Sequence, residues 1–147
     1  MAPKMTADEL NDFLIRVFSQ VADKFHVQEV GPHSATLRLR VGADDIRPGG
    51  TISGPSMFGL ADVAMYVATL AQIGPKALAV TTNCSIDFMR KPDGQRDLLA
   101  YARVLKLGRK LAVGDVLLYS EGSDAPVARA SLTYAIPPQG SAADVES

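Results

Sequence analysis

Asp62 is the side chain in this sequence that is best suited to chemistry. It is the only charged residue between Arg47 and Lys76, and the surrounding segment, residues 55–73, otherwise reads as largely buried. An ionised carboxylate is costly to bury unless it is paired or hydrogen-bonded. Asp62 therefore has either a structural partner or a chemical use, and we interpret it as a functional residue.

Three other residues with reactive side chains fit structural roles better. Cys84 falls on the apolar face of an alternating segment, which favours a small core residue over a nucleophile. His26 and His33 lie near an expected hairpin, where a histidine at the surface is usually only polar. No spacing around these residues matches that of metal ligands, so the sequence predicts no metal site.

The segment that carries Asp62 is expected to form one buried helix. Pro55 can occupy its first position, and Gly74-Pro75 supplies a stop just after the last apolar residue. The segment is long enough to span a bilayer, but Asp62, Gln72 and many alanines make it a poor membrane segment. A helix that is apolar on nearly all sides belongs inside a protein.

Further elements are expected on both sides of this helix. Thr6-Ala7-Asp8-Glu9 has the spacing of a capping box, and apolar residues then recur at helical intervals up to Val21. A hairpin follows, with strands over 25–30 and 36–41 on either side of Gly31-Pro32. Four more strands are expected over 78–88, 98–105, 111–119 and 127–136.

The order of these elements is typical of an antiparallel α+β domain, in which one sheet curls around the central helix. Within the strand 78–88, simple alternation puts Cys84 on the apolar face and Thr81 on the opposite face. A single sheet of this kind leaves an edge and a face that a second copy usually covers. We therefore expect a homo-oligomer, either a dimer or a tetramer.

Length and charge restrict the remaining possibilities. The 147 residues predict a single domain over 1–136, followed by a disordered tail over 137–147. The net charge of -1 gives no global field, so we expect neither nucleic acid nor a membrane as a partner. The lone Cys84 excludes an internal disulfide, and the start has no apolar run of signal-peptide length; both indicate the cytoplasm.

The segment from Arg47 to Pro55, which reads Arg-Pro-Gly-Gly-Thr-Ile-Ser-Gly-Pro and is followed by Leu60-Ala61-Asp62, resembles a known motif. It is similar to the loop-to-helix motif of hotdog-fold acyl-CoA thioesterases of the phenylacetate-degradation type. Residues 86–92 resemble the family's strand that ends before a proline, and Gly108-Arg109 its later hairpin. The resemblance covers roughly residues 25–136 and implies the hotdog fold, an antiparallel sheet wrapped around a central helix.

The family motif usually reads Asn-Pro-x-Gly-x-x-His-Gly-Gly, with an acidic residue nine positions after the His. Asp62 lies nine positions after Ser53 and takes the acidic position, while Gly54 takes that of the first Gly of the pair. The resemblance implies that Asp62 is the general base or nucleophile and that the Gly54 N–H donates to the thioester carbonyl. An N–H at a helix N-terminus is polarised towards such developing negative charge. Thr81 resembles a Ser or Thr that, in some relatives, comes from the partner subunit and helps to place the water.

The chain departs from the family motif at three positions. Arg47 stands where the family has Asn or Gln, Ser53 replaces the His, and Pro55 replaces the second Gly. Pro55 has no N–H, but Gly54 keeps its own. Ser53 can form a hydrogen bond, although it cannot titrate as His does. The catalytic machinery implied by the resemblance is therefore altered rather than absent.

The resemblance also implies a ligand and its contacts. The positions of Arg90, Lys91, Arg109 and Lys110 often lie near the phosphates of coenzyme A in the family, although such residues can simply solubilise strand ends. The expected function is hydrolysis of an acyl-CoA thioester, with coenzyme A as part of the substrate and no other cofactor.

Two alternatives to this function stay open. The first is a non-catalytic acyl-CoA or fatty-acyl binding module, which the missing motif His and Asn favour. The second, a hotdog hydratase or dehydratase, is weaker, because those enzymes generally need a catalytic His and neither His26 nor His33 lies on the buried helix. The acyl group and the choice between base and nucleophile for Asp62 are also open.

Overall fold

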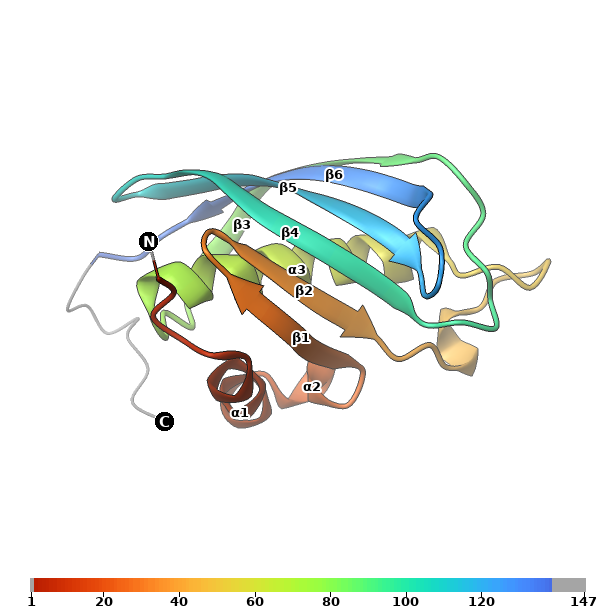
Figure 1. Ribbon diagram of the computed structural model, residues 1–147, viewed down its shortest axis with the longest axis horizontal. Coiled ribbons are helices and arrows are strands. Elements are labelled where there is room, and N and C mark those ends of the chain that lie inside the picture. The colour runs from red at the N-terminus through yellow and green to blue at the C-terminus, as the bar shows by residue number, and fades with distance from the viewer. Residues whose placement is uncertain (1, 139–147) are drawn as a thin grey trace.

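The computed structural model describes residues 2–138. Apart from Pro137 and Pro138, the tail that we expected to be disordered lies outside the described residues. Six antiparallel strands form one sheet in the order β1-β2-β4-β5-β6-β3, and this sheet curls around the long helix α3 (Figure 1). This is the expected α+β architecture. The elements are α1 (Ala7–Val17), α2 (Ser19–Ala22), β1 (Phe25–Gly31), β2 (Ser34–Leu39), a 3-10 turn (Ala43–Asp45), α3 (Gly54–Ile73), β3 (Val80–Phe88), β4 (Leu98–Leu107), β5 (Leu111–Ser120) and β6 (Pro126–Ala135).

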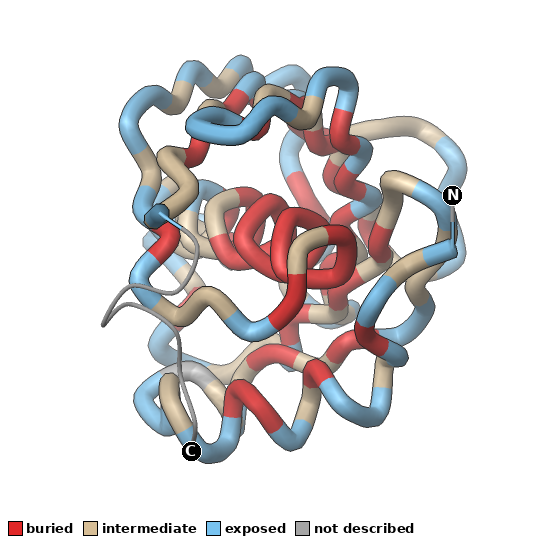
Figure 2. Tube along the Cα trace, turned by 90° about the vertical axis from the view of Figure 1, so that its left-hand side faces the viewer, coloured by how far each residue is buried: buried red, intermediate tan, exposed pale blue. Residues whose placement is uncertain are grey.

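Helix α3 lies at the centre of the core, and Figure 2 shows its turns as mostly buried, with the sheet around them. Every residue from Leu60 to Gln72 is buried except Asp62, which is half-buried. By length and composition α3 could cross a membrane. However, 72% of its most apolar 18-residue segment is buried, so its apolar surface packs against the sheet. Asp62 is thus the one side chain in this stretch of α3 that is partly exposed to solvent.

The ends of α3 differ slightly from the prediction. The helix begins at Gly54, so Pro55 takes its second position instead of the first. Ser53 is the N-cap, and its hydroxyl accepts a hydrogen bond from the Ser56 N–H. Gly74 ends the helix with a φ of 97°, a left-handed conformation that suits glycine.

The N-terminal segment forms two helices where one was predicted. The capping box is confirmed, because the Thr6 N–H donates to Glu9 and the Glu9 N–H donates to the Thr6 hydroxyl. However, α1 stops at Phe18, whose backbone leaves the helical region. The break turns the Phe18 ring edge-on against Tyr66 of α3, with centroids 6.1 Å apart. This aromatic contact docks the N-terminal segment onto the core.

Strand β3 carries a bulge that reverses one sequence prediction. Opposite β6, Thr81 pairs with Tyr134 and Asn83 pairs with Thr133, so Thr82 is an extra residue. Thr81 consequently points to the inner face of the sheet, the face on which Cys84 packs against the core. The expectation that Thr81 and Cys84 lie on opposite faces was therefore wrong, because simple alternation does not account for a bulge.

The same strand lies at the edge of the sheet, paired only with β6. Large apolar side chains are exposed on or next to it, namely Leu78, Val80, Phe88 and Met89. An unpaired edge with exposed apolar residues is a ready site for association with another strand.

Candidate active site

The Asp62 carboxylate contacts two hydroxyl donors, one from β3 and one from β6. Its Oδ1 atom accepts hydrogen bonds from Thr81 Oγ1 at 2.5 Å and from the Tyr134 hydroxyl at 2.7 Å. The half-buried carboxylate is therefore stabilised by two neutral donors, which is the pairing that its apolar setting requires. Both donors belong to the same chain as Asp62. The expectation that Thr81 of a partner subunit helps to place the water stays a prediction.

Tyr134 is a site residue that the sequence analysis missed. It lies on the inward face of β6 and is buried. Burial and the nearby charge of Asp62 both raise the pKa of the Tyr134 phenol, so it stays a hydrogen-bond donor at any ordinary pH. The sequence did contain one signal, because inward-facing and outward-facing residues alternate along β6 and Tyr134 falls on the inward face. This alternation predicts a core tyrosine but not its hydrogen-bond partner.

A hollow of about 410 Å³ opens beside Asp62. Its walls come from the end of α1 and the start of α2, from α3, from the segment entering β3 and from β6. They are largely apolar, and Asp62 is the only acidic group among them. The lining residues are Val17, Phe18, Gln20, Asp62, Val63, Tyr66, Ala77, Ala79, Val80, Thr81 and Tyr134.

Gly54 lies in a different hollow, of about 390 Å³, at the N-terminus of α3. It is eight residues before Asp62, which corresponds to about 12 Å along a helix axis. The Phe88 ring covers it closely, because a Cβ on Gly54 would meet the ring at 3.5 Å. Within one chain, the two residues expected to act on the same carbonyl are thus separated by two turns of helix.

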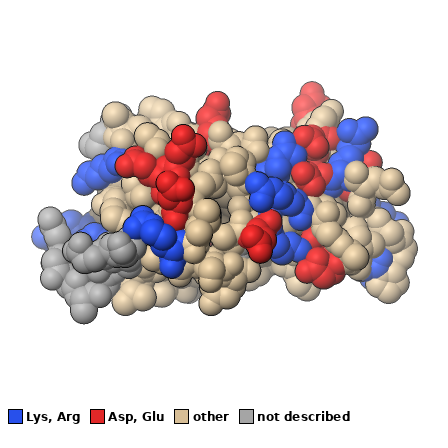
Figure 3. Space-filling model, turned by 90° about the horizontal axis from the view of Figure 1, so that it is seen from below, with Lys and Arg blue, Asp and Glu red and all other residues tan. Residues whose placement is uncertain are grey.

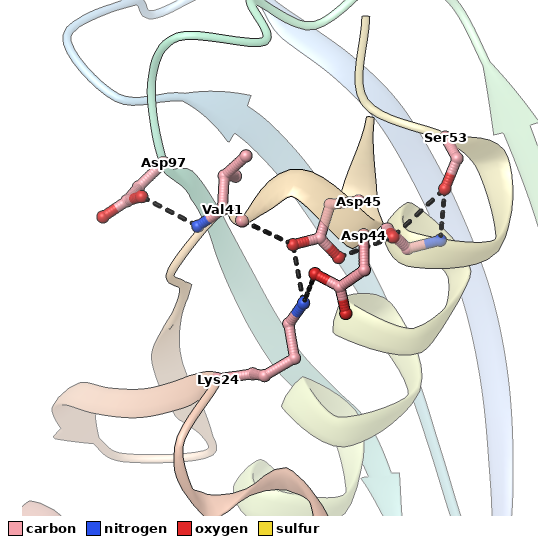
Figure 4. Close-up of polar contacts among 8 residues, drawn as sticks. Lys24, Val41, Asp44, Asp45, Ser53 and Asp97 are labelled. Carbon is pink, nitrogen blue, oxygen red and sulfur yellow. Dashed lines mark hydrogen bonds and ion pairs between the residues drawn. The ribbon is translucent and has the colours of Figure 1, made fainter. Parts of the chain in front are cut away.

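A buried carboxylate, Asp45, holds the loop that precedes Gly54 (Figure 4). Asp45 Oδ2 accepts hydrogen bonds from Lys24 Nζ at 2.6 Å and the Gly42 N–H at 2.8 Å, while Oδ1 accepts one from Ser56 Oγ at 2.8 Å. Burial opposes ionisation of this carboxyl, but those donors outweigh it and lower its pKa. Sequence analysis missed Asp45, which lies in an ordinary polar loop.

The Ser53 hydroxyl is fully engaged in capping. It accepts from the Ser56 N–H and donates to Ser56 Oγ at 3.1 Å, and the Ser53 N–H donates to the Asp45 carbonyl at 2.7 Å. The residue that stands at the family's His position is therefore used to fix the first turn of α3. That turn carries the Gly54 N–H.

The four basic residues expected to contact coenzyme A are not gathered in one place. Arg90 and Lys91 line the Gly54 hollow, and Arg90 also donates to the Pro126 carbonyl at 2.6 Å. Arg109 and Lys110 form the β4–β5 turn at the opposite end of the sheet (Figure 1). On the face shown in Figure 3, acidic and basic side chains of the described residues lie next to one another, so neither sign forms a continuous patch there.

The other reactive residues of the sequence have no part in either hollow. Burial and the charge of Asp62 raise the pKa of the Cys84 thiol, which disfavours the nucleophilic thiolate. His33 lies in the β1–β2 turn with a φ of 55°. Among the residues that the structure describes, no group of three His, Cys, Asp or Glu side chains is arranged to hold a metal ion.

The comparisons with known proteins agree with this fold. A family model described as the thioesterase superfamily matches residues 49–127. A candidate thioesterase from Silicibacter sp. TM1040 is 55% identical, with 94% of this chain and 96% of that chain covered and a TM-score of 0.87. A mutant of the phenylacetic acid degradation protein PaaI from Thermus thermophilus is 27% identical, with 86% and 99% covered and a TM-score of 0.68.

A more distant structure, zebrafish thioesterase superfamily member 2, shares the fold. It is 23% identical, with 91% of this chain and 100% of that chain covered and a TM-score of 0.79. No curated protein shows significant similarity to the chain. The family model covers more than half of the chain, and the fold agrees with it. The chain therefore belongs to the thioesterase superfamily and has the hotdog fold.

Proposed function

We propose that this protein hydrolyses an acyl-CoA thioester at a site that two subunits build together. The observation that carries the proposal is the Asp62 carboxylate, held by Thr81 and Tyr134 at the mouth of an apolar hollow in a chain of the thioesterase superfamily. Membership of that superfamily supports a thioester hydrolase. Acyl-CoA as the substrate is our proposal.

The separation of Gly54 and Asp62 supports a site shared between subunits. A hydrogen-bond donor must lie about 3 Å from the carbonyl oxygen, and the attacking atom must approach the adjacent carbon just as closely. Two groups about 12 Å apart along one helix cannot both meet one carbonyl. A second copy of the chain can supply the missing group.

The exposed edge at β3 supports a particular arrangement of the two copies. Antiparallel pairing of β3 with the β3 of a second copy about a twofold axis would place the Val80 end of each strand beside the Phe88 end of the other. Gly54 lies against Phe88. The end with Thr81 and Asp62 would then lie next to Gly54 of the partner subunit. The β4–β5 turn with Arg109 would lie near Arg90 of the partner subunit, which would reunite the basic residues that one chain separates.

In this site, the Asp62 carboxylate would remove a proton from a water molecule as the water oxygen bonds to the thioester carbon. The Gly54 N–H of the partner subunit would donate to the carbonyl oxygen as negative charge develops there. Collapse of the tetrahedral intermediate breaks the carbon–sulfur bond, and the departing thiolate takes up a proton. The products are the free acid and coenzyme A.

A nucleophilic role for Asp62 leads to the same products by two steps. Its carboxylate would bond to the thioester carbon and expel the thiolate, and water would then hydrolyse the resulting anhydride. After one turnover in ¹⁸O-labelled water, label in Asp62 would establish the anhydride route, because water then attacks the Asp62 carbon of the anhydride. Direct attack by water on the thioester puts the label only into the acid.

The basic residues at the strand ends would bind the phosphates of coenzyme A. Arg suits this role because its planar donors match phosphate oxygens, and Arg90, Lys91, Arg109 and Lys110 are all exposed. The apolar walls beside Asp62 suit an apolar acyl group.

A non-catalytic acyl-CoA binding module is the second candidate, and the capping role of Ser53 favours it. The side chain at the family's His position is used to cap α3. Release of free thiol from a panel of short, long and aromatic acyl-CoAs separates the two functions. Thiol release that depends on Asp62 supports the hydrolase, and tight binding of acyl-CoA without thiol release supports the binding module.

A further inference from the structure

We propose that Tyr134 is a positioning residue for Asp62. Together with Thr81 it holds the carboxylate through Oδ1, so that Oδ2 is the oxygen that reacts. The inference rests on the proposed function, and it adds a residue that the family motif did not indicate. It also assigns different tasks to the two oxygens of one carboxylate.

The contacts of the two Asp62 oxygens are unequal. Both Thr81 Oγ1 and the Tyr134 hydroxyl donate to Oδ1, whereas no donor among the described residues reaches Oδ2. The Tyr134 hydroxyl also lies 3.0 Å from the Asp62 backbone carbonyl. A phenol has one proton to donate, and the shorter contact to the charged oxygen is the stronger one. The lone pairs of Oδ2 are therefore left for a substrate or a water.

The Tyr134 hydroxyl is held in place by the core. Tyr134 is 3% exposed, and its ring packs on the Tyr66 ring with centroids 6.0 Å apart. The Tyr66 hydroxyl in turn donates to the Ala77 carbonyl at 2.9 Å. These rings cannot move without disturbing the core, so the Tyr134 hydroxyl is a fixed donor to Asp62. Without this donor, the Asp62 side chain could adopt several rotamers.

Thr81 is fixed from the opposite strand. The bulge at Thr82 turns Thr81 inward, and Thr81 is the register partner of Tyr134 across β3 and β6. The two donors thus approach Oδ1 from adjacent strands. This arrangement sets the direction of the Asp62 side chain in the same way that hydrogen-bonded neighbours orient other catalytic groups.

The pKa of the Tyr134 phenol, raised by burial and by Asp62, supports this role. The phenol keeps its proton, so it acts as a donor and not as a base. Titratable groups from three elements surround the carboxylate, namely Tyr66 of α3, Cys84 of β3 and Tyr134 of β6. Burial also raises the pKa values of Tyr66 and Cys84, so both stay neutral and add no charge near Asp62 at neutral pH.

The test is Tyr134→Phe, which keeps the ring and its packing but removes the hydroxyl. We expect kcat to fall roughly tenfold to hundredfold with KM little changed, since a hydrogen bond to a charged group is lost. The acidic limb of the pH profile of kcat should move to higher pH, because the ionised carboxylate has lost a donor. Tyr101→Phe, the same change at an exposed tyrosine of β4, is the matched control and should change neither quantity.

A second readout needs no substrate. In protein labelled with ¹³C at the aspartate carboxyl groups, the NMR titration midpoint of Asp62 should move to higher pH in Tyr134→Phe. If the wild type releases no thiol but the midpoint moves, the proposed function fails and the positioning role stands. If the wild type is active and Tyr134→Phe changes neither the midpoint nor kcat, the positioning role is overturned and the proposed function stands.

A third variant keeps the test decisive if Tyr134→Phe does not fold. Replacement of Tyr134 by 3-fluorotyrosine retains the ring and the hydroxyl but makes the hydroxyl a stronger donor. The Asp62 midpoint should then move to lower pH, in the direction opposite to the Phe variant. An unchanged midpoint in this variant contradicts the positioning role.

Discussion

Thr81 and Tyr134 are register partners across β3 and β6, and both donate to the same carboxylate oxygen of Asp62. The Thr81 hydroxyl would not meet Asp62 without the bulge at Thr82, which turns Thr81 to the inner face of the sheet. A backbone irregularity at the sheet edge therefore completes the polar surroundings of the one carboxylate on α3. Groups from α3, β3 and β6 thus meet at a single oxygen atom.

Asp62→Asn should abolish most of the activity while leaving the fold intact. The amide keeps the size of the carboxylate and can still accept hydrogen bonds, but it cannot take a proton or attack a thioester. A positioned general base contributes roughly 10²–10⁴-fold to a rate, so we expect kcat for thiol release to fall by that factor. Asp12→Asn on the exposed face of α1 is the control. Unchanged turnover in Asp62→Asn would remove this residue from the mechanism.

The buried helix and its carboxylate were predictable because their signals are local. An isolated charge in an apolar run, bounded by Pro55 and Gly74, can be recognised without any tertiary information. Tyr134 was not predictable, since its contact with Asp62 joins residues 72 positions apart and depends on the register of β6. Asp45 was missed for the same reason. Its buried carboxylate is paired with Lys24, which is 21 positions earlier in the turn before β1.

A mixture of two inactive variants should recover activity if each site uses Asp62 of one subunit and Gly54 of the other. Gly54→Pro removes the N–H donor, and proline is tolerated at the first helical position. A dimer of one Asp62→Asn chain and one Gly54→Pro chain has one intact site. Random reassortment of equal amounts should therefore restore about a quarter of wild-type thiol release.

Light scattering is the companion measurement for this mixture. It should detect a dimer or a larger assembly, because a shared site requires one. Val80→Lys, which adds a charge to the exposed edge of β3, should weaken the assembly and the activity together. A mixture that stays inactive, or an active wild-type monomer, would rule out the shared site.

Arg109→Ala should weaken the binding of an acyl-CoA far more than that of an acyl-pantetheine, which lacks the nucleotide. The reason is that Arg109 would contact only the phosphates, and added salt should shrink the difference because the residue is exposed. Isothermal titration calorimetry with both ligands measures the effect. Arg103→Ala, on the outer face of β4, is the control. Equal losses for the two ligands in Arg109→Ala would mean that this residue acts through folding or packing.

Asp45 should make the stability of the protein depend on acid pH. Its pKa is below the ordinary value of 3.8 because the donors around it favour the ionised form over the penalty of burial. Since the folded pKa lies below the unfolded one, this stabilisation is fully present above about pH 4. It is lost as the pH falls through the folded value. The free energy of unfolding should therefore decrease below about pH 4 in the wild type and change less in Asp45→Asn.

At neutral pH, Asp45→Asn should lower the free energy of unfolding by about 1–3 kcal/mol, because it breaks a largely buried pair with Lys24. Asp44→Asn is a closely matched control, since Asp44 contacts the same Lys24 Nζ at 3.0 Å but has 77% of its side chain exposed. An exposed pair of this kind contributes only about 0.2–1 kcal/mol. Urea unfolding of both variants gives the comparison. Similar losses in the two variants would show that the burial of Asp45 does not strengthen its pairing, and the loop before Gly54 would then need another anchor.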